Sequence, residues 1–198
     1  MLLKFKSLKI VAGCDEAGRG CLAGPVFASA VILPNNFKCK ILDDSKRLSP
    51  KVRLKLKKHI MNESLAWSIG TVSEEEIDKL NILNASFLAM HRAIDNLKID
   101  PELLIIDGNR FNKYKNTEHI CIVKGDQKFM SIAAASIIAK TYRDDYMKKI
   151  DLEHPLYNWK SNKGYPTLEH RKSLVKYGVT KYHRKSFQLV NNQFNIDF

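Results

Sequence analysis

Three acidic residues stand at the ends of short apolar runs in a chain that is otherwise rich in Lys and Arg. Asp15 closes the run 9–15, Asp107 follows the run 103–106, and Asp126 follows the run 120–123. Carboxylates gathered at one edge of a sheet repel one another and lose solvation, so a divalent cation usually neutralises them. Asp next to Gly is also a common turn signal, and on spacing alone a plain turn role is an equal alternative.

A second acid, Glu16, directly follows Asp15. Side chains of adjacent residues in a regular strand point to opposite faces of the sheet. Both carboxylates therefore reach one site only if the strand ends between them, and the nearby Gly18 and Gly20 make such an ending plausible.

Another acidic pair, Asp144 and Asp145, lies in the longest expected helix, at about 127–150. Each residue follows an apolar residue by seven positions, Ile137 and Ile138 respectively, so helical periodicity cannot choose between them. Without further information, a solvated charge pair near a helix end is the favoured interpretation.

The elements that must position these acids form an α/β pattern. A hairpin is expected from 9–15 and 26–33, because turn-forming glycines separate two apolar runs, and 65–72 reads as a third strand. The runs 103–106 and 120–123 are apolar on both faces and predict buried central strands. Helices are expected after Ser49-Pro50, after the capping-box pair Ser73 and Glu76, and at 84–97, 127–150 and 168–177. Strands first, then alternating helix and strand, indicate a mixed sheet with helices on it.

Charge and composition limit the class of partner. The 198 residues hold 33 Lys and Arg against 21 Asp and Glu, a net charge of +12, which favours a polyanionic partner and nucleic acid in particular. The sequence lacks an apolar run near the roughly 20 residues that span a membrane, and lysines interrupt the first 13 residues, unlike a signal peptide. The four cysteines show no zinc-like spacing, so we expect reduced thiols in a cytoplasmic protein.

Several ordered motifs together closely resemble the signature of ribonuclease HII. They span residues 11–187, and they are Asp15-Glu16-Ala17-Gly18-Arg19-Gly20 with Leu22-Ala23-Gly24-Pro25-Val26, Asp44-Ser45-Lys46, Asp107-Gly108-Asn109, Lys124-Gly125-Asp126, the run from Ser131 to Asp144, Gly164-Tyr165-Pro166-Thr167 with His170, and His183-Arg184 with Ser186-Phe187. Two positions depart from it: Cys21 stands where proline is expected, and Tyr142 where a small residue is frequent. Neither is an expected metal ligand.

The resemblance implies a ribonuclease H-like fold, an α/β mixed sheet flanked by helices. We expect a catalytic domain over residues 1–153 and a small, basic, helical extension over 154–198 packed on it. Residues 154–191 of that extension hold eight Lys or Arg against a single acid, Glu169. We expect a monomer, because nothing in the sequence signals an interface.

The resemblance also implies a four-carboxylate site made of Asp15, Glu16, Asp107 and Asp144. It selects Asp144 over Asp145 and leaves Asp126 with a near-site or structural role. Four carboxylates can hold two Mg²⁺ or Mn²⁺ ions, the arrangement that hydrolyses phosphodiesters in two-metal nucleases.

The implied substrate is a ribonucleotide within an RNA/DNA hybrid or a single ribonucleotide embedded in duplex DNA. Cleavage is expected on its 5′ side, leaving a 5′-phosphate and a 3′-hydroxyl, for ribonucleotide removal and RNA primer degradation. The Gly18-Arg19-Gly20 segment resembles the family element that contacts the 2′-hydroxyl through its backbone. Tyr165 matches a tyrosine that stacks on the next sugar, and Lys46 is an expected phosphate contact.

Three alternatives remain at this point. Another nuclease or a junction resolvase of the same broad fold would share the carboxylates but lack the Gly-Arg-Gly and Gly-Tyr elements. A non-catalytic nucleic-acid-binding protein would gain nothing from four acids that repel phosphate. Metal-free acid–base chemistry by histidines is conceivable, but His91, His154, His170 and His183 are scattered, and the last two are expected to pack or to touch phosphate.

Overall fold

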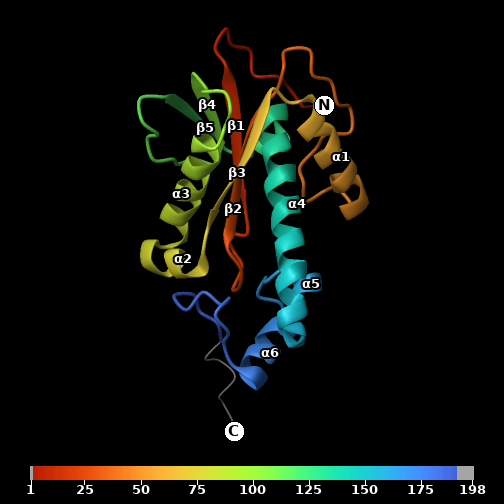
Figure 1. Ribbon diagram of the computed structural model, residues 1–198, viewed down its shortest axis with the longest axis vertical. Helices are drawn as coiled ribbons and strands as arrows, with labels where there is room; N and C mark the ends of the chain where they lie inside the picture. The colour runs from red at the N-terminus through yellow and green to blue at the C-terminus, as the bar shows by residue number, and fades with distance from the viewer. Residues whose placement is uncertain (1, 191–198) are drawn as a thin grey trace.

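The computed structural model describes residues 2–190 and contains one five-stranded mixed sheet (Figure 1). The strands lie in the order β3-β2-β1-β4-β5; β1 pairs antiparallel with β2, and β2 with β3, whereas β1–β4 and β4–β5 are parallel. The expected α/β class and the hairpin are confirmed. The strands are β1 (Val11–Ala17), β2 (Val26–Ile32), β3 (Ala66–Val72), β4 (Leu103–Asp107) and β5 (Glu118–Ile122).

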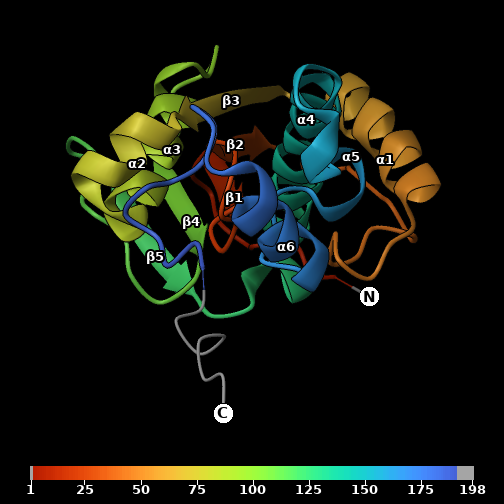
Figure 2. The same ribbon diagram turned by 90° about the horizontal axis from the view of Figure 1, so that it is seen from below.

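Helices cover both faces of the sheet, with α3 on one side and the long α4 on the other (Figures 1 and 2). Ser49 accepts a hydrogen bond from the Val52 N–H at the start of α1, and Ser73 and Glu76 form the expected capping box of α2. None of the helices in residues 2–190 combines the length and apolar character needed to cross a bilayer. The helices are α1 (Pro50–Glu63), α2 (Glu74–Leu80), α3 (Ile82–Asp95), α4 (Met130–Glu153), α5 (Trp159–Asn162) and α6 (Leu168–Tyr177), with short 3₁₀ turns η1 (Gly125–Gln127) and η2 (Pro155–Tyr157).

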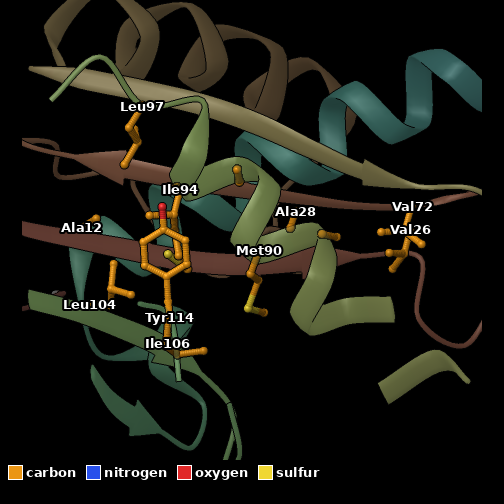
Figure 3. Close-up of a cluster of buried hydrophobic side chains, with 14 of the residues drawn as sticks. Ala12, Val26, Ala28, Val72, Met90, Ile94, Leu97, Leu104, Ile106 and Tyr114 are labelled. Atoms are coloured by element: carbon orange, nitrogen blue, oxygen red, sulfur yellow. The ribbon is translucent and has the colours of Figure 1, made fainter. Parts of the chain in front are cut away.

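The alternation of side chains along β1 and β4 divides the core into two layers. Cys14 and Ile106 belong to the layer between the sheet and α3, which Figure 3 shows in close-up. The layer on the other face packs the alanine-rich middle of α4 and α1 against the sheet. Residues next to Cys14 and Ile106 along their strands therefore face α4.

Gly13 allows α4 to lie directly against β1. A Cβ atom built on Gly13 would come within 2.3 Å of the carbonyl carbon of Ser131 and 2.5 Å of the Ile132 nitrogen. Both atoms belong to the backbone and cannot swing away, so only glycine permits this approach. The close contact fixes the height of α4 over the strand that carries Asp15.

Two expectations about the strands are wrong. The last strand, β5, is an edge strand and not a buried central one, and Ile120 on it is 43% exposed. Strand β1 does not end between Asp15 and Glu16, since it stays paired with β2 as far as Ala17. Its pairing with β4 stops at Cys14 and Ile106, which leaves the β4-side edge open at both acids.

Residues 154–190 pack against the end of the sheet and the loop between β1 and β2 (Figure 2). The Gly24 N–H donates to the Tyr182 carbonyl at 2.9 Å, and the Arg184 N–H donates to the Leu22 carbonyl at 2.9 Å. Helix α6 has the predicted bounds. The division into domains at 153 and 154 stays a prediction, and the part of the predicted extension beyond residue 190 lies outside the described residues.

The contact at Gly13 predicts a large loss of stability for Gly13→Ala. Because the added Cβ would clash with the Ser131–Ile132 peptide and force α4 away from the sheet, we expect the free energy of unfolding to fall by about 2 kcal/mol or more. Urea denaturation monitored by circular dichroism measures this. Gly20→Ala is the matched control, because a Cβ there meets no atom within 4 Å. Equal stability of the two variants would contradict the role assigned to Gly13.

Candidate active site

The register of β1 and β4 places Asp15 beside Asp107. Each residue follows the last paired residues, Cys14 and Ile106, by one position, and both therefore face α4. Asp15 is buried, and the Ser136 hydroxyl of α4 lies near its carboxylate. Two parallel strands thus bring two carboxylates to the same edge of the sheet.

Glu16 joins this pair from the adjacent position on β1. Its backbone N–H donates to Asp15 Oδ1 at 2.7 Å, and its carboxylate lies 3.4 Å from the Arg19 guanidinium. Burial raises the pKa of Asp15 well above its usual range, and the charges of Glu16 and Asp107 raise it further. The pKa of Glu16 is raised mainly by burial, although Arg19 opposes the shift. The two acids are thus crowded by negative charge.

Asp126 is the fourth carboxylate of this group. It lies in the turn η1, where the Gly125 N–H donates to Asp107 Oδ1 at 2.7 Å. Burial, with the charges of Asp107 and Asp44, raises the pKa of Asp126 to about 6, and Asp126 in turn raises the pKa of Asp15. The structure therefore gathers Asp15, Glu16, Asp107 and Asp126.

Asp144, the fourth acid expected from the resemblance, lies apart from this group. Its carboxylate is 2.6 Å from Lys140 Nζ and 3.7 Å from Arg53 Nη2. It follows Ser136, which lies near Asp15, by eight residues on α4, which corresponds to about 12 Å along the helix axis. Its neighbour Asp145 is half-exposed and pairs with Lys57 and Lys148.

Lys46 supplies positive charge next to the carboxylates. The loop that carries it is fixed by Asp44 Oδ1, which accepts from the Lys46 N–H at 2.8 Å, and by a 2.9 Å hydrogen bond between the Ser45 and Ser136 hydroxyls. Burial alone would lower the pKa of Lys46, but the carboxylates led by Asp15 and Asp126 raise it overall. The ammonium group therefore stays charged beside the acids.

Arg184, whose guanidinium is fully buried, supports the Gly18-Arg19-Gly20 segment from its inner side. Arg184 donates to the carbonyls of Gly18 at 2.7 Å and of Arg19 at 2.9 Å, and also to that of Gly24. In a trans peptide the N–H points opposite to the C=O. The N–H groups of Arg19 and Gly20 therefore point away from Arg184, and the space above Gly20 is open.

A second buried arginine, Arg143, continues this support. It donates to the carbonyls of Pro25 at 3.0 Å, Ala23 at 3.0 Å and Lys163 at 2.8 Å. Gly18 has a φ of +94°, and a Cβ on it would lie 1.9 Å from the Arg143 side chain. Sequence reasoning missed both arginines as supports, although the dipeptides Arg143-Asp144 and His183-Arg184 stand within the motifs.

Tyr165 lies in the turn that follows Lys163 and is 39% exposed. The carbonyl of the preceding Gly164 accepts from the Leu22 N–H at 2.7 Å, which ties the turn to the loop after Gly20. Burial of the ring's inner side raises the pKa of Tyr165, and the adjacent Cys21 thiol raises it further. The structure thus brings the predicted substrate-binding residues Gly18, Arg19, Gly20 and Tyr165 to one surface.

The donor set suits a hard divalent cation, although the side chains are not already gathered around one. Across residues 2–190, no three acidic, His or Cys side chains converge closely enough to coordinate an ion as they stand. The four neighbouring carboxylates nevertheless offer only oxygen donors, as Mg²⁺ and Mn²⁺ prefer. The pKa values of Asp15, Glu16 and Asp126 are raised by burial first and then by neighbouring negative charge, which Lys46 and Arg19 do not fully balance. The residues present therefore fit a metal site.

Comparisons with known proteins agree with the motifs. The family model described as Ribonuclease HII matches residues 12–190. Ribonuclease HII of Christiangramia forsetii is 61% identical to this chain, and that of Parabacteroides distasonis is 60% identical, each over 100% of both chains.

Solved structures agree with the fold. The ribonuclease H2 of Pyrococcus horikoshii has a TM-score of 0.75 at 25% identity and covers 90% of this chain and 94% of its own. The ribonuclease HII in the PCNA complex from Archaeoglobus fulgidus has a TM-score of 0.78 at 24% identity over 92% and 96% of the two chains. The family model and the full-length relatives together show that this chain belongs to the ribonuclease HII family.

Proposed function

We propose that this chain is an endoribonuclease that hydrolyses the phosphodiester on the 5′ side of a ribonucleotide, both in RNA/DNA hybrids and at single ribonucleotides in duplex DNA. The observation that carries the proposal is the group of neighbouring carboxylates beside Lys46, made of the buried Asp15 and Asp126 and the half-buried Glu16 and Asp107. Such a group repels a polyanion unless cations neutralise it, yet the chain as a whole carries a charge of +12. A bound cation resolves this conflict.

Mg²⁺ or Mn²⁺ would be held by Asp15, Glu16, Asp107 and Asp126. When bound, a pair of such ions supplies an activated water and stabilises the charge of the transition state. A structure of the related ribonuclease HIII of Bst was solved with Mn²⁺. Lys46 would contact a phosphate oxygen of the substrate, since its ammonium stays charged beside the acids.

The enzyme would recognise its substrate through contacts to the ribose. The N–H groups of Arg19 and Gly20, directed outward by Arg184, can donate to a 2′-hydroxyl, which DNA lacks. The exposed face of Tyr165 can pack on the neighbouring sugar. The 2′-hydroxyl then serves recognition and is not the nucleophile, so the products carry a 5′-phosphate and a 3′-hydroxyl.

A single copy of the chain would suffice for this activity. All the named groups come from one chain, so we propose that it works as a monomer, which light scattering after gel filtration can test. Its four cysteines are free thiols, in keeping with the reducing cytoplasm, where we place it. The function there would be removal of ribonucleotides and RNA primers from DNA.

The first prediction concerns a labelled DNA duplex with one embedded ribonucleotide. We expect cleavage 5′ of the ribonucleotide with Mg²⁺ or Mn²⁺, none with EDTA, and an intact all-DNA control. Denaturing gels with end-group analysis measure both position and products. Cleavage of the all-DNA control would point to another nuclease of the same fold. A 2′,3′-cyclic phosphate would contradict the mechanism, and binding without cleavage would leave a basic binding protein.

The second prediction separates the two candidates for the fourth carboxylate. We expect Asp126→Asn to lower kcat by about 10³-fold, because an oxygen donor of the metal site is lost. Asp144→Asn should keep kcat within about tenfold, because its carboxylate is already paired with Lys140 and Arg53. Asp107→Asn serves as the positive control: it should abolish cleavage while hybrid binding survives. The reverse order of effects would restore Asp144 as the metal ligand.

The third prediction concerns the pH dependence of thermal stability in the absence of metal ions. The pKa of Asp126 is about 6 in the folded protein and about 3.9 in an unfolded chain, so its contribution to stability is complete below about pH 4 and is lost as the pH rises through 6. In EDTA, the Tm of Asp126→Asn should therefore exceed that of the wild type increasingly between pH 4 and pH 7.5. Differential scanning calorimetry measures the difference. Asp145→Asn, at a half-exposed residue, is the control and should show no such increase.

A further inference from the structure

Two buried histidines, His170 and His183, have no part in the mechanism above. They pack with Trp159 in the cluster between α5, α6 and the segment that follows α6, and all three side chains are at most 1% exposed. A buried imidazole must have hydrogen-bond partners for both ring nitrogens. Here every partner is present, and the partners determine where the protons lie.

The indole of Trp159 fixes the tautomer of His170. An indole N–H can only donate, and Trp159 Nε1 lies 3.0 Å from His170 Nε2, so that nitrogen is the acceptor. The proton of the neutral ring is then on Nδ1, which lies 2.9 Å from the carbonyl oxygen of Tyr165. His170 therefore donates to the backbone of the residue proposed to contact the sugar, and this carbonyl also accepts from the Thr167 N–H.

The backbone of Thr180 fixes the tautomer of His183 in the same way. The Thr180 N–H donates to His183 Nδ1 at 2.9 Å, so the proton of His183 is on Nε2. That atom lies 3.2 Å from His170 Nε2, whose one lone pair is then shared between the His183 and Trp159 N–H groups. A chain of donors thus runs from Thr180 through both rings to the carbonyl of Tyr165.

Both rings must be neutral for this chain to exist, because a second proton on either would set N–H against N–H. The surroundings agree: burial lowers the pKa of both, and the neighbouring rings of His170 and His154 help to lower that of His183 to about 4. The other ionisable groups that face the pair are Arg171 and Glu169 of α6, Tyr157 of η2, and Tyr182 across Trp159.

We propose that His170 and His183 are positioning residues that set the place of Tyr165 relative to the Gly18-Arg19-Gly20 segment. His183 holds the Tyr165 turn through His170, while the next residue, Arg184, holds the carbonyls of Gly18 and Arg19. The dipeptide His183-Arg184 thereby sets the distance between the Gly18-Arg19-Gly20 segment, proposed to contact the ribose, and Tyr165, proposed to contact the adjacent sugar. The inference rests on the proposed function and adds two residues that act on substrate selection without touching substrate.

The test compares two substitutions of His170, each of which retains a hydrogen-bonding group at the position of only one ring nitrogen. The amide nitrogen of Asn occupies the place of Nδ1, whereas the terminal amide of Gln occupies the place of Nε2. His170→Asn should therefore keep the donor to Tyr165, with KM for the single-ribonucleotide duplex within about threefold of the wild type. His170→Gln loses that donor, and KM should rise about tenfold, the effect of one buried hydrogen bond, with kcat changed less. His91→Gln, on α3, is the control.

The protons can be observed directly in the wild-type protein, which needs no variant to fold. A ¹⁵N–¹H correlation spectrum of the imidazoles should show His170 as the neutral Nδ1–H form and His183 as the neutral Nε2–H form. A charged ring, or the opposite tautomer at His170, would overturn the proposal, as would equal KM values for the two His170 variants. If the wild type does not cleave the embedded ribonucleotide at all, the proposed function is wrong. The observed tautomers then still test whether His170 donates to the Tyr165 carbonyl.

Discussion

The mutual repulsion of four neighbouring carboxylates, two of them buried, is the constraint that the rest of this structure must withstand. Asp15, Glu16, Asp107 and Asp126 are held together by covalent position, by the register of β1 and β4, and by the Gly125 N–H, and not by attraction to one another. Such a site needs a rigid frame, which the direct contact of α4 with Gly13 provides. A cation bound there, as proposed above, would relieve this repulsion.

Much of the fold could be predicted from the sequence, since its signals are local. The capping residues Ser49 and Ser73 begin their helices where expected, and the hairpin follows from two apolar runs around glycines. The position of β5 at an edge could not be predicted, because a short apolar run carries no information on how many neighbours a strand has. Strand order is a property of the whole sheet.

Strand ends in the sequence point to Asp15, Asp107 and Asp126, whereas the resemblance takes Asp144 in place of Asp126, and the sequence does not decide between these two. Asp126 and Asp144 both stand in motifs, and helical periodicity says only which way a side chain points, not how far along the axis it lies. That distance depends on where α4 meets β1, at Gly13 and Ser131, which no local pattern encodes. The same holds for Arg143 and Arg184, whose partners are backbone carbonyls up to 166 residues away and leave no complementary residue type in the sequence.

The pairing of residues 22–24 with residues 182–184 also bears on how the molecule comes into being. During synthesis the sheet and α4 can form long before Arg184 leaves the ribosome. The carbonyls of Gly18 and Arg19 can accept hydrogen bonds from the Arg184 guanidinium only after that residue has emerged. This closure has a very large sequence separation, so it is entropically costly and late. A nascent chain therefore acquires its acidic group before it fixes the Gly18-Arg19-Gly20 segment, the element proposed to contact the ribose.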